Sequence, residues 1–189
     1  MAPCSRRAVE EHAAALPKQV SADGTLPSAV AKDSANAWAF VHLVATSKET
    51  NVVVAALKGM LATFVNPDAK VARRVNTDAS YDQAVLAKLD DPDPRVQGYA
   101  IRAAGVTISG TEPNRAIVSA LTRLSAEHPK PEGRMAALSE LWRARGLEKE
   151  HLAPYVAAVD AEQTWLVTVA LLRLKGQAAR LAETGVLRE

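Results

Sequence analysis

The residues from 89 to 105 constrain the fold more than any other part of the chain. Their sequence is LDDPDPRVQGYAIRAAG. Asp93 is a favourable N-cap residue, and Pro94 then takes the first helical position, where its missing N–H costs nothing. Apolar residues follow at helical spacing, and we expect Gly105 to end the helix in a left-handed conformation. This stretch therefore predicts a helix with a defined start, a core-facing side and a defined end.

The same pattern returns along the chain. Before residue 94, apolar residues at helical spacing predict helices over 5–16, 34–45, 47–64 and 80–89. We expect Ser34 to cap the second of these, and Ser80 to open the last through a capping box with Gln83. The segment 18–33 is rich in Ser, Gly and Pro and is predicted to be a linker. Downstream, further helices are expected over 115–124, 131–146, 148–159, 160–176 and 177–184.

Composition supports an all-α fold. Hydrophobic residues make up 48% of the 189 residues and aromatic residues only 4%, and alanine is abundant. Alanine has the highest helix propensity, and small side chains let helices approach closely. The chain is long enough for a sizeable core. We expect residues 1–33 to form an N-terminal helix and linker arm and residues 34–189 to form one domain of repeated helical hairpins.

The segment 91–105, with its Asp-Pro turns followed by a valine and pairs of alanines, resembles the HEAT-repeat family in its bacterial, HEAT-like form. The resemblance is good over 89–124, moderate over 128–181 and poor before residue 80. It implies an α-solenoid, a right-handed superhelix of about three to four HEAT-like hairpins. Gly105, Gly146 and Gly176 would end helices at intervals of roughly 30 to 40 residues, the length of such repeats. The family has Arg directly after the valine, whereas this chain has Gln97, so the family's ladder of Asp–Arg contacts is not implied.

Motifs that carry chemistry are absent from the sequence. The acidic residues 90, 91 and 93 lack the glycine and the distal glutamate of a calcium loop, so we interpret them as turn and cap residues. No two of the four histidines have i, i+4 spacing, and the single cysteine, Cys4, excludes a multi-cysteine zinc site. No serine elbow, phosphate loop or dinucleotide fingerprint occurs. We therefore expect no catalytic residue, no metal ligand and no cofactor, and the chain is predicted not to be an enzyme.

The predicted function is a protein-interaction scaffold. In HEAT-like stacks the second helices of the hairpins line the concave face, where partners dock. The polar side of the helix 115–124 carries Arg115, Ser119 and Arg123, and the following second helix carries His151 and Tyr155 four residues apart. We expect these five residues to bind acidic or polar groups of a partner protein; the alternative is an ordinary solvated face. The three tryptophans are interpreted either as packing residues or as exposed anchors.

The sequence is also compatible with other functions. Some HEAT-like proteins bind nucleic acid as alkylated-base DNA glycosylases, although a net charge of +2 does not favour a nucleic-acid partner. Others attach chromophores as lyases. A third alternative is a structural module of an envelope assembly, lipid-anchored through Cys4. No apolar run reaches the length of a membrane span. We expect a cytoplasmic protein, with a periplasmic or Cys4-anchored one as the alternative, and self-association through the C-terminal repeat.

Overall fold

The computed structural model of the chain describes residues 6–64, 79–108, 114–144, 151 and 153–154. In these residues the backbone forms helices and turns and no β-strand, which confirms the prediction of an all-α protein. The chain divides into two compact units, Met1–Thr107 and Ile108–Glu189. Each unit has its own helices and its own buried apolar residues.

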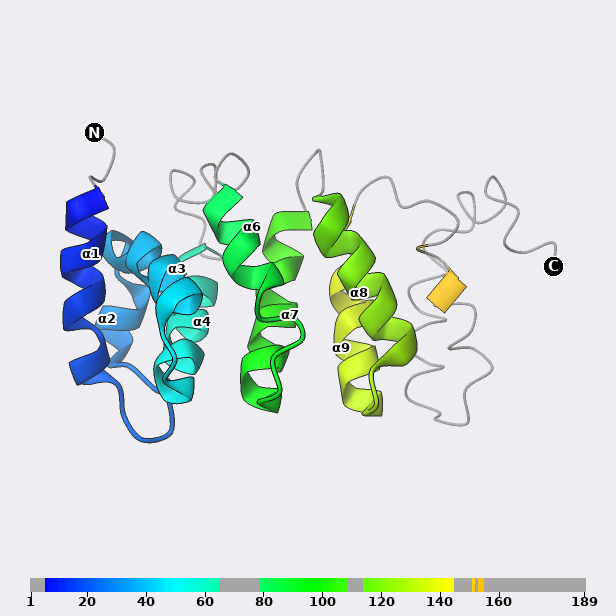
Figure 1. The fold of residues 1–189 in the computed structure, drawn as a ribbon, viewed down its shortest axis with the longest axis horizontal. Helices are drawn as coiled ribbons and strands as arrows, with labels where there is room; N and C mark the ends of the chain where they lie inside the picture. The colour runs from blue at the N-terminus through cyan, green and yellow to red at the C-terminus, as the bar shows by residue number, and fades with distance from the viewer. Residues whose placement is uncertain (1–5, 65–78, 109–113, 145–150, 152, 155–189) are drawn as a thin grey trace. The chain divides into compact units, whose positions relative to one another are not determined.

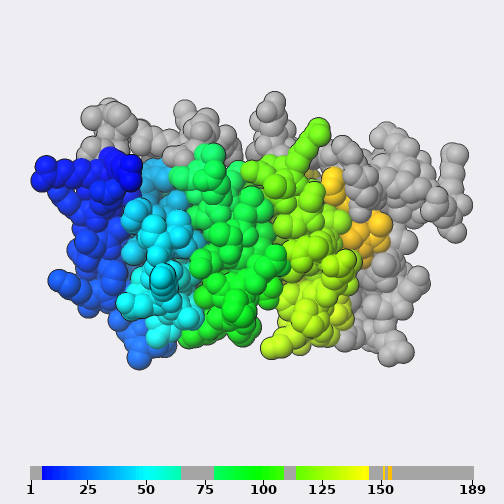
Figure 2. All heavy atoms as spheres, viewed as in Figure 1, coloured from blue at the N-terminus to red at the C-terminus, as the bar shows by residue number. Residues whose placement is uncertain are grey.

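The first unit is built from helices that pack against their near neighbours in sequence (Figure 1). Helix α3 contacts α1, α4 and α6, and α2 lies against α4. In Figure 2 the atoms of α3 and α4 (cyan) meet those of α6 and α7 (green) without a visible gap. The helices are α1 (Arg6–Ala15), α2 (Ser28–Lys32), α3 (Ala37–Thr46), α4 (Thr50–Phe64), α6 (Ala79–Leu86) and α7 (Pro94–Ile108), with short 3₁₀ turns at Pro17–Gln19 and Ser34–Asn36.

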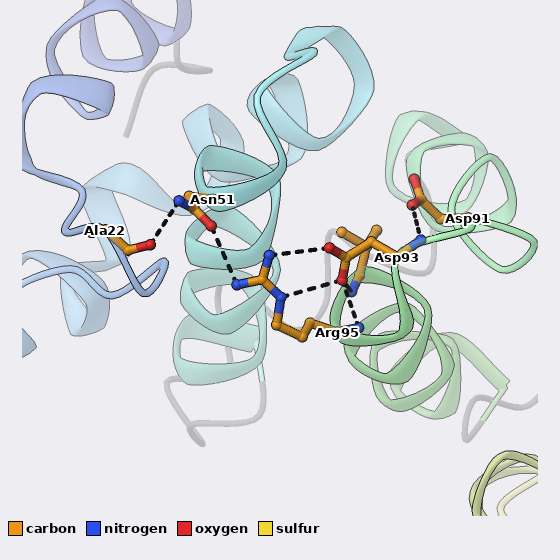
Figure 3. A network of polar contacts seen from close by, with 6 residues as sticks. Ala22, Asn51, Asp91, Asp93 and Arg95 are labelled. Atoms are coloured by element: carbon orange, nitrogen blue, oxygen red, sulfur yellow. Dashed lines mark hydrogen bonds and ion pairs between the residues drawn. The ribbon is translucent and has the colours of Figure 1, made fainter.

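The start of α7 agrees with the sequence prediction (Figure 3). The carboxylate of Asp93 accepts hydrogen bonds from the backbone amides of Arg95, at 2.8 Å, and Val96, at 3.4 Å. The amide of Asp93 in turn donates to Oδ1 of Asp91, at 3.0 Å. The acidic cluster therefore shapes the turn and caps the helix.

Several predicted helix boundaries are wrong. Gly105 lies inside α7, which continues to Ile108 because that fully buried side chain extends the core-facing stripe. Burial of such a side chain is worth more than the roughly 1 kcal/mol by which glycine weakens a helix. Ser80 is already helical, since α6 begins one residue earlier. Ser34 does not cap α3, which begins at Ala37 after Asn36 and has no side-chain cap. Ser34 lies instead in a 3₁₀ turn that is capped by Asp33, whose carboxylate accepts from the backbone amide of Ala35. The helix predicted to stop at Gly146 ends instead at Leu141. Gly146 and Gly176 themselves lie outside the described residues.

The segment 18–33, expected as a linker, is fastened to α4. The side-chain amide of Asn51 donates to the carbonyl of Ala22, at 2.7 Å, and the Lys58 ammonium donates to the carbonyl of Gly24, at 2.9 Å. Gly24 has φ of +72°, and a Cβ there would lie 3.0 Å from Val54, so only glycine fits this tight turn. Leu26 is buried, and α1 packs on α3 through its own buried residue Ala13.

An aromatic trio links three helices in the core of the first unit. The ring of Phe64 stands edge-to-face against Trp38, with centroids 5.6 Å apart, and against Tyr81, at 5.0 Å. Tyr81 is fully buried and its hydroxyl donates to the carbonyl of Ala103, at 3.2 Å. Burial, with the nearby charge of Asp82, raises the pKa of Tyr81 well above its usual value. Trp38 thus has a packing role; Trp142 is half-buried, and Trp165 lies outside the described residues.

The second unit contains a hairpin of α8 (Arg115–Glu127) and α9 (Pro131–Leu141), which pack against each other. The side chain of Asn114 caps α8 by accepting from the amides of residues 116 and 117, a cap that the sequence analysis did not identify. Pro131 takes the first position of α9, as expected from the Pro-rich turn. The buried apolar side chains of this hairpin are Ile117, Val118, Leu121, Leu124, Ala137, Leu138 and Leu141.

Removing the cap at Asp93 is expected to destabilise the first unit in a pH-dependent manner. Hydrogen bonding from Arg95 holds the pKa of the Asp93 carboxyl below its usual value. The carboxylate therefore adds stability above about pH 4, the pKa of an unfolded Asp, and this stability is lost as the pH falls through the lower folded pKa. In urea unfolding followed by circular dichroism at pH 7, the free energy of unfolding of Asp93→Ala should be about 1 kcal/mol lower than that of wild type.

The control is Asp93→Asn, which keeps an oxygen that can cap the helix but carries no charge. We expect its free energy of unfolding at pH 7 to lie between those of wild type and Asp93→Ala. The difference between wild type and Asp93→Ala should shrink below pH 4, while that between Asp93→Asn and Asp93→Ala should stay constant. A wild-type advantage that is the same at pH 7 and below pH 3 would contradict the role of the charged carboxylate.

Candidate functional site

The structure places three of the five predicted partner-binding residues on one exposed side of α8. Arg115, Ser119 and Arg123 are all exposed and follow one another at intervals of four residues. We refer to these three residues as the α8 face. The opposite side of α8 is held against α9 by Ile117, Leu121 and Leu124, each of which is buried. The α8 face is therefore presented on a helix whose position and rotation are fixed by packing.

The other two predicted residues are not joined to the α8 face in the described structure. His151 is helical and half-buried, and Tyr155 lies outside the described residues. The prediction that these two residues share a surface with the α8 face therefore stays a prediction.

A second exposed surface, which the sequence analysis did not identify, lies in the first unit. The Lys58 ammonium of α4 is 5.6 Å from the centre of the Tyr99 ring of α7, and the Arg102 guanidinium, also of α7, is 5.7 Å from it. Both distances fall within the range of cation–π attraction. Arg102 is exposed, and Lys58 and Tyr99 are half-buried. We refer to Lys58, Tyr99 and Arg102 as the Tyr99 surface.

The charges around the Tyr99 surface are unevenly compensated. One turn earlier on α7, Arg95 is paired with Asp93, at 3.1 Å, and also donates to Oδ1 of Asn51, at 3.3 Å (Figure 3). In the described residues no carboxylate lies within ion-pair distance of Lys58 or Arg102. The carboxylate of Asp23, near Lys58, instead accepts from the hydroxyls of Ser21 and Thr25. Among the described residues, Arg102 thus has an aromatic ring beside it but no carboxylate within ion-pair distance.

A sequence signal for this surface existed. Arg95, Tyr99 and Arg102 stand at i, i+4 and i+7, so they share the polar side of the helix 94–105, opposite its apolar stripe. The contribution of Lys58 could not be predicted in the same way, because it depends on α4 lying beside α7.

The histidines and acidic residues of the described ranges do not gather into a metal site. Within these ranges, no group of three His, Cys, Asp or Glu side chains is arranged to hold a metal ion. The buried His128 serves the turn between α8 and α9: the amide of Lys130 donates to its Nδ1, at 3.0 Å, and Arg134 donates to its carbonyl, at 2.7 Å. None of the described helices combines the length and the apolar character needed to cross a bilayer.

The arrangement offers two exposed polar faces on helices that are fixed from behind by apolar packing. Comparison with the models of known protein families, with curated proteins and with solved structures finds no match to this chain.

Proposed function

We propose that the chain is a protein-interaction scaffold that binds a partner protein through the exposed faces of its helices, and that it is not an enzyme. The observation that carries this proposal is the α8 face, where two arginines and a serine project from one side of a helix whose other side is buried. Side chains on such a fixed helix bind with less loss of conformational entropy than side chains on a loop. Arginine also offers several N–H donors to the polar groups of a partner.

We also propose a repeat architecture and a cellular location for the chain. Hairpins such as α3–α4 and α8–α9 would be units of a right-handed α-solenoid of HEAT-like repeats, with His151 and Tyr155 adding to the α8 face. The low aromatic content and the abundance of alanine favour such a stack of closely approaching helices. We further propose a cytoplasmic location, which suits a chain with a single cysteine. Self-association would use the C-terminal repeat, which lies outside the described residues.

Photocrosslinking tests the α8 face directly. Benzoylphenylalanine introduced at Ser119 of the full chain should give a discrete crosslinked product with one partner protein in cells of the source organism. The same probe at Ala14, an exposed position of α1, is the control and should not give that product. The product should be lost when the probe-bearing chain also carries Arg115→Glu/Arg123→Glu. Without these two substitutions, the product should also form when the chain is mixed with the purified partner. Equal labelling from Ser119 and Ala14, or a product that survives the double substitution, would contradict binding at this face.

A further inference from the structure

The Tyr99 surface is a pre-arranged site for negative charge. Two cations, one from α4 and one from α7, lie over the same aromatic ring. Within the described residues neither forms an ion pair with a carboxylate, although Asp23 lies near Lys58. Lys58 is further held by its hydrogen bonds to the carbonyl of Gly24 and to the hydroxyl of Thr25. Restraining both side chains before binding lowers the entropy that a ligand would otherwise have to offset.

The chemistry of the Tyr99 surface favours carboxylates. A guanidinium that lies over an aromatic ring still presents N–H groups at its edge, and these match the two oxygens of a carboxylate. Arg102 is exposed, so a ligand can reach it. Arg95, one turn from Tyr99 and two turns from Arg102, is already paired with Asp93 and adds little net charge. The surface therefore suits a ligand that brings about two negative charges rather than a long row of them.

A nucleic acid fits these observations less well. Binding of DNA or RNA generally rests on many phosphate contacts, whereas the Tyr99 surface offers two cations on a chain of net charge +2. Stacking of bases also needs an open aromatic face. The Tyr99 ring is approached by both cations, at 5.6 and 5.7 Å, which reduces the face available to a base.

We propose that Lys58, Tyr99 and Arg102 form a binding site for an acidic segment of a partner protein, with Arg102 and Lys58 each contacting a carboxylate. The site lies in the first unit and does not depend on the α8 face of the second unit. A negative result for one surface in its own test therefore does not contradict the proposal for the other surface.

Fluorescence anisotropy with a labelled octaglutamate peptide tests this site on the full chain. Arg102→Glu should weaken binding at least tenfold, because a charge-assisted contact is replaced by repulsion. Tyr99→Leu leaves the net charge unchanged but removes the ring that both cations approach, and it should weaken binding severalfold. Lys32→Glu is the matched control: it makes the same change of charge at an exposed position of α2 and should change affinity less than about twofold. Circular dichroism of each variant establishes that it remains helical.

Several results would overturn the proposal. Equal weakening by Arg102→Glu and Lys32→Glu would mean that only the overall charge attracts the peptide. An unchanged affinity in Tyr99→Leu would remove the ring from the site. Tighter binding of octathymidylate than of octaglutamate, sensitive to Tyr99→Leu, would identify a nucleic-acid surface instead. Absence of saturable octaglutamate binding up to about 1 mM, the weakest affinity that counts as specific here, would also overturn it.

Discussion

Placing a side chain at Gly59 is expected to destabilise the first unit strongly. A Cβ built at this position of α4 would lie 2.6 Å from Cε2 of Phe40 and 2.7 Å from two further atoms of the same ring. Phe40 is fully buried on α3, so the ring has no free space to move into. Overpacking of a core costs about 1–3 kcal/mol, and the helix propensity of alanine returns up to about 1 kcal/mol. With the full propensity gain, Gly59→Ala should therefore lower the free energy of unfolding by up to about 2 kcal/mol, and Gly59→Val should lower it more, as measured by urea unfolding.

Two further variants separate the steric cause from a general effect of glycine replacement. A Cβ added at Gly98, on α7, would meet no atom within 4 Å, so Gly98→Ala should instead stabilise the protein by about 0.5–1 kcal/mol. Phe40→Leu combined with Gly59→Ala should cost less than the sum of the two single changes, because the smaller side chain makes room. Strict additivity, or stabilisation by Gly59→Ala, would contradict the close approach of α3 and α4.

Truncation of Tyr81 is expected to have the largest effect of any single substitution proposed for this chain. The variant Tyr81→Ala removes a fully buried ring that packs edge-to-face on Phe64, and it also removes the hydrogen bond to the carbonyl of Ala103. Large-to-small aromatic substitutions in cores cost about 3–5 kcal/mol. We expect Tyr81→Ala to fall in this range in urea unfolding, and Tyr81→Phe, which loses the hydroxyl alone, to cost about 1 kcal/mol.

The matched control for Tyr81 is Tyr99. Its ring is half-buried on the exposed side of α7 and interacts with Lys58 and Arg102, so Tyr99→Ala loses less packing. We expect it to cost less than half as much as Tyr81→Ala. If the two substitutions destabilise equally, the aromatic trio is not the element that joins α3, α4 and α6.

The features that were predictable from the sequence are local ones. Asp93 and Pro94 define a helix start through contacts within four residues, and the apolar stripe of α8 identifies its buried side through a simple period. The exposed positions of the α8 face follow from the same period. The end of α7 was not predictable in this way, because Gly105 stops a helix only when nothing beyond it can be buried, and Ile108 is buried.

Contacts between helices account for most of what the sequence did not reveal. The approach of Gly59 to Phe40 and of Lys58 to Tyr99 depends on which helices lie side by side. The HEAT-like pattern did not imply an Asp–Arg ladder, since Gln97 replaces the usual arginine. In the structure, Gln97 donates to the carbonyl of Leu89, and it is Arg95 that reaches Asn51 of the preceding hairpin.

The hydrogen bonds that join segments of the first unit also bear on how the chain folds during its synthesis. The bonds from Asn51 to Ala22, from Tyr81 to Ala103 and from Arg95 to Asn51 span 29, 22 and 44 residues. These separations are small compared with the 189 residues of the chain, contacts of low sequence separation favour fast folding, and domains fold as units during synthesis. Each helix of the first unit therefore meets its partners soon after it leaves the ribosome. Until Tyr81 has been synthesised, the side of the Phe64 ring that Tyr81 covers in the folded unit lacks its packing partner.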